Sequence, residues 1–356
     1  MTANRPKFVS KFTAVYDWEQ VMRRSYVVMS EPQITPATES EPPAQAGKRL
    51  TLRIPGSTAN LGPGFDCFGL ALSLYCRLTF TLLETRNNDT PLITFAGAIA
   101  QSSLPQDTGN LVYKILKQLW KDQSDMLDRI RIHVDSDIPL GCGLGSSAAA
   151  ILGALWADNV FKDRIPTTGT LLAQASLLEG HSETLAASLM GKFVITAPSA
   201  TANSIVARQL NWPSAWRTIF VVPSYRMKTE KSRSVLPKTV NHADAVWNMQ
   251  RSALFISAIS TCDENTLREA LHDRLHEPYR EALVPELGSL RRALVNQPIL
   301  GCVLSAGGPS MLVIVNERHR ADVLAHIEEW AAAQNDHPRV LDLRVDEDGI
   351  RQIRGF

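Results

Sequence analysis

The stretch PLGCGLGSSAAA, residues 139–150, places three glycines and two serines between an apolar run and an alanine-rich run that favours a helix. Glycines let backbone N–H groups face a ligand without side chains in the way, and the start of a helix attracts negative charge. The stretch therefore predicts an anion site at the start of a helix, with phosphate as the natural ligand.

Two common nucleotide-binding motifs do not fit this loop. No lysine follows Gly145, as a Walker loop requires, and GCGLG does not match the G-x-G-x-x-G fingerprint of dinucleotide-binding folds. Ser146 and Ser147 fall in the first turn of the predicted helix, where their hydroxyls can cap it or bind a phosphate-bound metal. From these residues alone, a glycine-rich turn into a capped helix stays an alternative.

The rest of the chain alternates strand-like and helix-like runs. RLTLRIP, CRLTFTLLE and RIRIHVDSD have the character of strands, and NLVYKILKQLW and AAAILGALWA have helical periodicity. A second such series begins near residue 216. A length of 356 residues favours two domains, and the boundary is expected near residues 200–216, where PSATANSIVARQLNWPSAW lacks a clear period. We expect a mixed α and β chain with domains at 49–205 and 206–356.

Residues 1–48 differ in composition from the remainder. EPQITPATESEPPAQAG is rich in Pro, Glu, Ser, Thr and Ala and cannot bury enough apolar surface to order itself, so we expect a disordered tail. The preceding KFTAVYDWEQVMRRSYVV has the pattern of a short helix. Its basic residues fit organellar targeting, but Asp17 and Glu19 argue against that role. Met29 is an alternative start.

Composition limits the function classes. A net charge of +1 without a basic stripe argues against a nucleic-acid partner. No apolar run reaches the roughly 18 residues of a membrane span, which argues against a membrane partner. The five cysteines are scattered and show no metal-ligand spacing, so we expect reduced thiols, no zinc site and a cytoplasmic location. A homodimer stays open.

Five motifs in order resemble one family. PLGCGLGSSAAA is similar to the phosphate loop of the GHMP kinases, and RIPGSTANLGPGFDCFGLALSLY (53–75) closely resembles the N-terminal signature of the homoserine kinases within them. GCVLSAGGPSMLVIV (301–315) resembles their C-terminal glycine motif, and the segments starting at Thr229 and Leu271 also agree. The resemblance implies a two-domain α+β fold with a ribosomal S5-like N-terminal domain and a ferredoxin-like C-terminal domain. It implies transfer of the γ-phosphoryl group of ATP to the hydroxyl of L-homoserine.

The resemblance also implies where ATP and Mg²⁺ bind. Ser147 and Glu179 are the implied metal ligands, although Glu179 could be an ordinary exposed glutamate. Asn110 is implied to line the adenine pocket, and a helix cap is the alternative for its side chain. The residues expected to bind ATP are Asn110, Pro139, Leu140, Gly141, Cys142, Gly143, Leu144, Gly145, Ser146, Ser147 and Ala148.

Homoserine is a zwitterion, so its site should offer carboxylates to the ammonium group and guanidinium groups to the carboxylate. By resemblance, Asn60 and Asp66 hold the amino end and the hydroxyl, and Arg233 and Arg280 hold the carboxylate. Asn60, Asp66 and Arg233 also position the acceptor, and no residue is assigned as a general base. The residues expected to bind the acceptor are Asn60, Asp66, His181, Glu183, Thr184, Thr229, Arg233 and Arg280.

One motif departs from the family pattern. Homoserine kinases usually carry an HPDN-like run where this chain has His181, Ser182, Glu183 and Thr184. The carboxylate is one methylene longer, and the amide is replaced by a hydroxyl. Two alternatives therefore stay open: a kinase for another hydroxylated small molecule, and an inactive module that binds ATP or amino acids.

Overall fold

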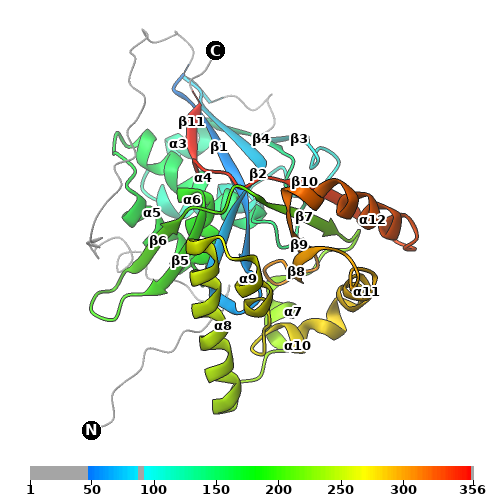
Figure 1. Ribbon diagram of the computed structural model, residues 1–356. Helices are drawn as coiled ribbons and strands as arrows, with labels where there is room; N and C mark the ends of the chain where they lie inside the picture. The colour runs from blue at the N-terminus through cyan, green and yellow to red at the C-terminus, as the bar shows by residue number, and fades with distance from the viewer. Residues whose placement is uncertain (1–46, 87–91, 354–356) are drawn as a thin grey trace.

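The computed structural model describes residues 47–86 and 92–353 (Figure 1). The predicted disordered tail, apart from its last two residues, lies outside these ranges, as do the helix predicted before it and Met29. The described chain forms two sheets and their covering helices, so the α+β architecture is confirmed. In these two ranges, no helix combines the length and the apolar character that crossing a membrane demands.

The larger sheet has seven strands and is built around a long antiparallel hairpin. Its first two strands pair from Arg49 opposite Thr81 to Ala59 opposite Gly69, with bulges after Pro55 and Ala59. The strand order is β11-β1-β2-β4-β3, and β5 pairs with both β2 and β6. The strands are β1 (Arg49–Asn60), β2 (Gly64–Leu82), β3 (Ile93–Gly97), β4 (Ile130–Ser136), β5 (Phe193–Pro198), β6 (Ile205–Leu210) and β11 (Arg351–Ile353).

Helices from the first half of the chain pack on this sheet, with α4 and α6 against β1 and β2. Helix α4 is buried on most sides, and Gly153 permits its close approach, since a Cβ there would lie 2.2 Å from Cδ1 of Leu78. The helices are α2 (Leu111–Leu119), α3 (Ser124–Arg129), α4 (Ser146–Phe161), α5 (Thr168–Glu179) and α6 (Glu183–Met190).

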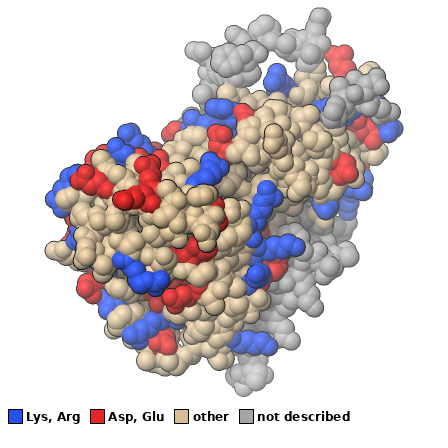
Figure 2. Space-filling model, turned by 90° about the vertical axis from the view of Figure 1, so that its right-hand side faces the viewer, with Lys and Arg blue, Asp and Glu red and all other residues tan. Residues whose placement is uncertain are grey.

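The second sheet has four antiparallel strands in the order β10-β7-β9-β8. Its strands are β7 (Trp216–Val222), β8 (Ile299–Leu304), β9 (Met311–Asn316) and β10 (Arg339–Leu343). The accompanying helices are α7 (Thr229–Ser234), α8 (His242–Thr261), α9 (Glu264–Ala270), α10 (Glu277–Arg280), α11 (Pro285–Ala293) and α12 (Arg320–Ala332), with short 3₁₀ turns η1 (Glu281–Leu283) and η2 (Glu317–His319). On the face in Figure 2, acidic and basic residues are interspersed.

The two halves of the chain share one hydrophobic core. Strand β11 returns to pair with β1, and the two lie side by side in Figure 1 although they come from opposite ends of the chain. Phe255 of α8 packs its ring 5.1 Å from that of Phe68 on β2 and 5.6 Å from that of Phe193 on β5. The domain boundary at residues 205 and 206 therefore stays a prediction.

The sequence reading missed strand β6, which lies inside the segment that lacked a clear period. β6 pairs only with β5, so it is an edge strand, and its residues are half-buried or exposed. An edge strand with little buried surface needs no strict alternation of apolar residues. That is why the hydrophobic pattern did not reveal it.

Replacing Phe255 with alanine tests the shared core. The side chain is fully buried, so Phe255→Ala should lower the free energy of unfolding by about 3–5 kcal/mol. Met249→Ala on the same helix is the matched control, because that side chain is 66% exposed and its loss should change stability by less than about 0.5 kcal/mol. Chemical denaturation measures both, and equal midpoints would show that α8 contributes nothing to this core.

Candidate active site

The glycine loop, residues 139–145, connects β4 to α4 and depends on the absence of side chains. Gly141, Gly143 and Gly145 have φ angles of +64°, +74° and +84°, a region that disfavours residues with a Cβ. A Cβ at Gly143 would lie 2.5 Å from the carbonyl oxygen of Ser305, and one at Gly145 would lie 2.5 Å from Oγ of Ser57. Both glycines are required by close backbone packing.

Helix α4 begins directly after this loop with an open amino end. Its N-cap is Gly145, which has no side chain to accept the first N–H groups. The free N–H groups and the helix dipole therefore face the cavity described below, as an anion site requires. Side-chain capping, the alternative reading of this loop, does not occur at its N-cap.

The two expected metal ligands lie in contact. Oγ of Ser147 donates a hydrogen bond to Oε2 of Glu179, with 2.8 Å between the oxygens. Glu179 is the last residue of α5, which Gly180 ends in a left-handed conformation, and its side chain is 11% exposed. A hydroxyl and a carboxylate beside a phosphate site are the oxygen ligands that Mg²⁺ prefers. The described residues hold no cluster of three or more His, Cys, Asp or Glu fit for a metal, so the remaining ligands would come from phosphate and water.

Asn60 is the last residue of β1 and Asp66 lies near the start of β2, on either side of the turn between these strands. Nδ2 of Asn60 donates to the carbonyl oxygen of Ala306 at 2.8 Å, and its Oδ1 accepts the N–H of Asp66 at 3.0 Å. Arg233 of α7 binds the carboxylate of Asp66 with two hydrogen bonds of 2.9 and 2.6 Å. Burial alone would lower the pKa of the Arg233 guanidinium, but the hydrogen bonds and charge of Asp66 outweigh it, and the pKa is raised.

Arg280 of α10 is the more deeply buried arginine, at 2% exposure. Its Nε donates to the carbonyl oxygen of Ser232 at 3.1 Å, and its Nη1 lies 3.0 Å from Nδ1 of His276. Burial, followed by the nearby charge of Arg233, lowers the pKa of Arg280 to about 10. We name Asn60, Asp66, Arg233 and Arg280, which the sequence predicts to bind the acceptor, the acceptor clamp.

In the motif that departs from the family pattern, the imidazole of His181 lies beside two carboxylates. Nδ1 of His181 lies 3.1 Å from Oε1 of Glu183, and its Nε2 lies 3.7 Å from Oε1 of Glu179. Burial lowers the pKa of His181, but the charge of Glu183 outweighs it, so the pKa is raised. Burial raises the pKa of Glu183, and the charge of His181 outweighs that effect and lowers it. Oγ1 of Thr184 is buried without a hydrogen-bond partner in the described part of the chain.

One cavity of about 130 Å³ brings most of the predicted residues together. Of the predicted residues, those that line it are Asn60, Asp66, Gly141, Gly143, Gly145, Ser146, Ser147, Ala148, Glu179, His181, Glu183, Thr184, Thr229, Arg233 and Arg280. A larger cavity of about 610 Å³ lies beyond α10, between α9, α11 and β8, and none of the predicted residues lines it.

Five expected ATP-binding residues do not line this cavity. Asn110 caps α2, with Oδ1 accepting the N–H of Val112 at 2.9 Å, so its role beside adenine stays a prediction. Cys142 and Leu144 turn their side chains into the core. The predicted residues outside the cavity lining are Asn110, Pro139, Leu140, Cys142 and Leu144.

Five further residues line the cavity and were not predicted from the sequence: Met227, Ser232, Ala306, Gly307 and Gly308. The last three belong to the C-terminal glycine motif, so that motif was the signal for them. Oγ of Ser232 donates to the carbonyl oxygen of Gly307 at 2.7 Å, which joins α7 to this motif.

Comparison with known proteins places the chain in a class. The family model described as GHMP kinases N terminal domain matches residues 110–192, and that described as GHMP kinases C terminal matches residues 255–332. The crystal structure of homoserine kinase from Cytophaga hutchinsonii superposes with a TM-score of 0.75 at 22% identity, covering 88% of this chain and all of that one. The matched family models and the superposition agree on the fold of the GHMP kinases, which are ATP-dependent small-molecule kinases.

Two relatives that are similar in sequence define the family within this class of kinases. The homoserine kinase of Desulfitobacterium hafniense is 34% identical over 304 residues, which cover 85% of this chain and 100% of that protein. The homoserine kinase of Solibacter usitatus is 36% identical over 307 residues, with 85% and 97% covered. The chain belongs to the homoserine kinase family.

Substitution of Gly145 tests whether the glycine loop binds the phosphates of ATP. Gly145→Ala places a methyl group against Ser57, so the loop must move, and the Kd for ATP should rise at least about tenfold, or 1.4 kcal/mol. The matched control is Gly180→Ala, where φ is +86° but no atom lies within 4 Å of the added Cβ. It should lose about 1–2 kcal/mol of stability and keep its ATP affinity. Calorimetric titration with ATP measures the affinity of both variants. Wild-type affinity in Gly145→Ala would contradict a role of the glycine loop in ATP binding.

Proposed function

We propose that this chain transfers the γ-phosphoryl group of ATP to the side-chain hydroxyl of L-homoserine and forms O-phosphohomoserine, a step of threonine biosynthesis. The observation that carries the proposal is a single cavity that combines a glycine loop for phosphate with carboxylates and guanidinium groups for a zwitterion. Sequence relatives named homoserine kinase at 34% and 36% identity support the same substrate.

In this proposal the acceptor clamp holds the ends of homoserine. The guanidinium groups of Arg233 and Arg280 bind its carboxylate, and Asn60 and Asp66 bind its amino end and orient its hydroxyl. Both carboxylate oxygens of Asp66 accept hydrogen bonds from Arg233. When the acceptor binds, Asp66 and Arg233 must therefore share their hydrogen bonding with it. Holding the hydroxyl in line with the phosphoryl group is the main work of the protein in such a reaction.

The phosphate side of the cavity positions ATP. The amino end of α4 and the N–H groups of the glycine loop neutralise phosphate charge. We propose that Ser147 and Glu179 hold Mg²⁺, which supplies charge neutralisation on the phosphates when bound. We assign no general base, because the ionised phosphates and the bound metal can take over that work in such a reaction.

A specific observation favours a second acceptor as the alternative. The carboxylate of Glu183 turns back to accept the N–H of Ser182 at 3.1 Å and to pair with His181. It is therefore committed within its own motif, and the acceptor ammonium loses a partner that a shorter aspartate could offer. A different hydroxylated small molecule, one without an ammonium group at this place, would then fit better than homoserine.

Further expectations about the whole chain also stay proposals. We propose two domains, 49–205 and 206–356, because the four-stranded sheet is built entirely from residues after 215, while β11 returns to the first sheet. All five cysteines are free thiols, which supports the proposed cytoplasmic location. The homodimer stays a prediction.

An acceptor panel tests the substrate. Release of ADP with Mg²⁺ and ATP should be rapid with L-homoserine. It should fall in kcat/KM by about 10- to 100-fold with 4-hydroxybutyrate, which lacks the ammonium, and with homoserine methyl ester, which lacks the carboxylate. Turnover of another hydroxy amino acid without turnover of homoserine would contradict the proposal. Binding of Mg·ATP without transfer to any acceptor would indicate an inactive module.

Substitution of Ser147 tests the metal site. Ser147→Ala should raise the Mg²⁺ concentration for half-maximal rate at least about tenfold and lower kcat, because one oxygen ligand is lost. Ser146→Ala is the comparison, since its hydroxyl does not contact Glu179, and its effect on the Mg²⁺ requirement should be smaller. A Mg²⁺ titration at saturating ATP measures both, and a larger effect in Ser146→Ala would move the ligand to that residue.

A further inference from the structure

The acceptor clamp is assembled from two parts of the chain that are joined through His276. This residue precedes α10 and is fully buried. Its Nε2 lies 2.8 Å from the carbonyl oxygen of Gly62, in the turn between Asn60 and Asp66. Its Nδ1 lies 3.0 Å from Nη1 of Arg280. One imidazole therefore contacts both sides of the clamp.

The chemistry of these neighbours defines the hydrogens on the ring. A carbonyl oxygen only accepts, so Nε2 of His276 must carry a hydrogen, and a guanidinium group only donates, so Nδ1 must be bare. The ring is thus the neutral Nε2–H tautomer, with each nitrogen matched to its neighbour. Phe65 stacks on it with 5.3 Å between ring centroids. Oδ2 of Asp273, the nearest carboxylate, lies 3.7 Å from Nε2, beyond hydrogen-bond distance.

Two further buried side chains hold His276 in place. The Oδ2 atom of Asp273 accepts the backbone N–H groups of His276 and Glu277 at 2.8 and 2.7 Å, which fixes the start of α10. Nδ2 of Asn248 donates to Oδ1 of Asp273 at 2.9 Å and to the carbonyl oxygen of Pro63 at 3.1 Å. We name Asn248, Asp273 and His276 the clasp.

Across residues 47–86 and 92–353, the clasp leaves Arg280 without a carboxylate in hydrogen-bond contact, and the charges of Asp66, Asp273 and Glu277 act on it only from a distance. Within the described residues, the acceptors that its guanidinium contacts are the carbonyl oxygens of Ser232 and Ala306 and the ring of His276. None is a carboxylate. A buried guanidinium that is hydrogen-bonded but not ion-paired is well prepared for an anionic ligand.

We propose that His276 is a positioning residue for the acceptor: it sets the separation between the turn that carries Asn60 and Asp66 and the guanidinium of Arg280. The proposal rests on the proposed function for the identity of the acceptor. His276 acts through Arg280 and the turn, and it does not touch the acceptor itself. Its loss should therefore weaken acceptor binding and leave ATP binding intact.

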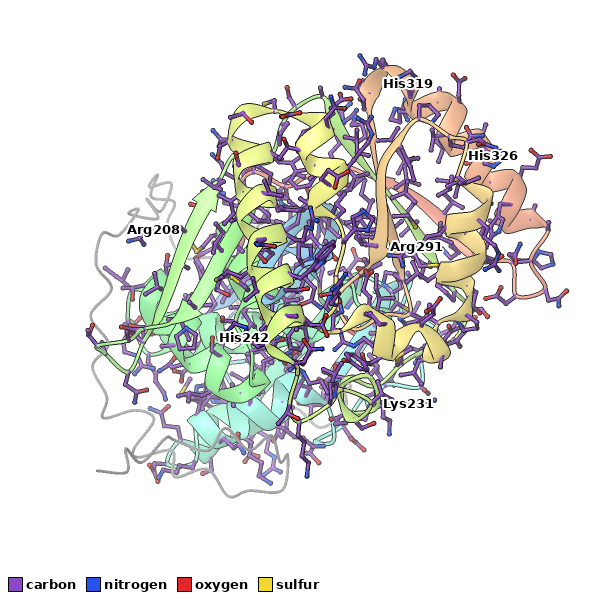
Figure 3. All side chains as sticks on the ribbon, turned by 60° about the horizontal axis from the view of Figure 1, so that its bottom comes forward. Arg208, Lys231, His242, Arg291, His319 and His326 are labelled. Carbon is purple, nitrogen blue, oxygen red and sulfur yellow. The ribbon has the colours of Figure 1, made fainter. Side chains whose placement is uncertain are left out.

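Two substitutions separate hydrogen bonding from packing. His276→Phe keeps a ring for Phe65 but removes both hydrogen bonds, and it should raise the KM for the acceptor at least about tenfold with the KM for ATP within about twofold. His276→Gln retains one donor and one acceptor, and the rise should shrink to about threefold or less. His326→Phe is the matched control, because its ring also contacts a backbone carbonyl, that of Ala293 at 3.1 Å, but lies on α12 (Figure 3). It should change neither KM.

A double-substitution cycle tests the route through Arg280. In an Arg280→Ala background, His276→Phe should raise the acceptor KM by no more than about twofold, because the group that it positions is gone. Equal factors in both backgrounds would overturn the proposal. So would an unchanged acceptor KM in folded His276→Phe, an equal rise in His276→Gln, or a parallel rise in the KM for ATP.

A spectroscopic measurement tests the clasp independently of any acceptor. In protein labelled with ¹⁵N histidine, the His276 ring should show the Nε2–H tautomer, assigned by the resonances that disappear in His276→Phe. An Nδ1–H tautomer or a charged ring would overturn the proposed geometry. If homoserine is not phosphorylated by the wild-type protein, the proposed function fails, whereas this result still decides the tautomer on which the inference rests.

Discussion

The candidate active site depends on the close approach of three backbone segments, which backbone hydrogen bonds and the short side chains of Thr58, Asn60 and Ser305 join. These segments are the STANLGPGFD turn, the glycine loop and the SAGGPS motif, which lie far apart in the sequence. The N–H of Ser57 donates to the carbonyl oxygen of Leu144, and the N–H of Ala306 donates to that of Ala59. A single Cβ at Gly143 would press on the backbone of the third segment. The proposed phosphate site and the acceptor clamp are therefore joined through direct backbone contacts.

This packing determines the electrostatics of the site. The glycine loop contributes only backbone N–H groups, and the positive charge is supplied by two arginines that reach the cavity from α7 and α10. Asp66 neutralises Arg233, while carbonyl groups and an imidazole surround Arg280. Both guanidinium groups also lie over the ring of Phe65, Arg233 at 5.6 Å and Arg280 at 5.4 Å from the ring centroid. The clamp thus places an arginine that is paired with a carboxylate beside one with none of the described carboxylates in hydrogen-bond contact, in a cavity of about 130 Å³.

The sequence predicted those features of the site that depend on neighbouring residues, and it did not by itself reveal contacts between residues far apart in the chain. The glycine loop was predictable from its own residues, because positive φ angles and an uncapped helix start are local requirements. The contact of Ser147 with Glu179, which are 32 residues apart, was predicted only through resemblance to a family. Asn248 and His276 escaped notice, since a buried Asn or His signals nothing until the fold shows its partners. Strand β6 escaped because an edge strand with little buried surface carries no strict pattern.

The departure at Glu183 gains a physical meaning from its neighbours. An added methylene gives the carboxylate enough length to fold back on the N–H of Ser182 and on His181, both within its own motif. The backbone of Glu183 has no room to move closer to β2. A Cβ at Gly69 would lie 2.2 Å from the carbonyl oxygen of Glu183, so α6 already lies as close to β2 as a backbone allows. Glu183 lines the cavity, but its carboxylate oxygens are held by Ser182 and His181. For the ammonium end of the proposed acceptor this leaves Asn60 and Asp66, the residues to which the clasp connects Arg280.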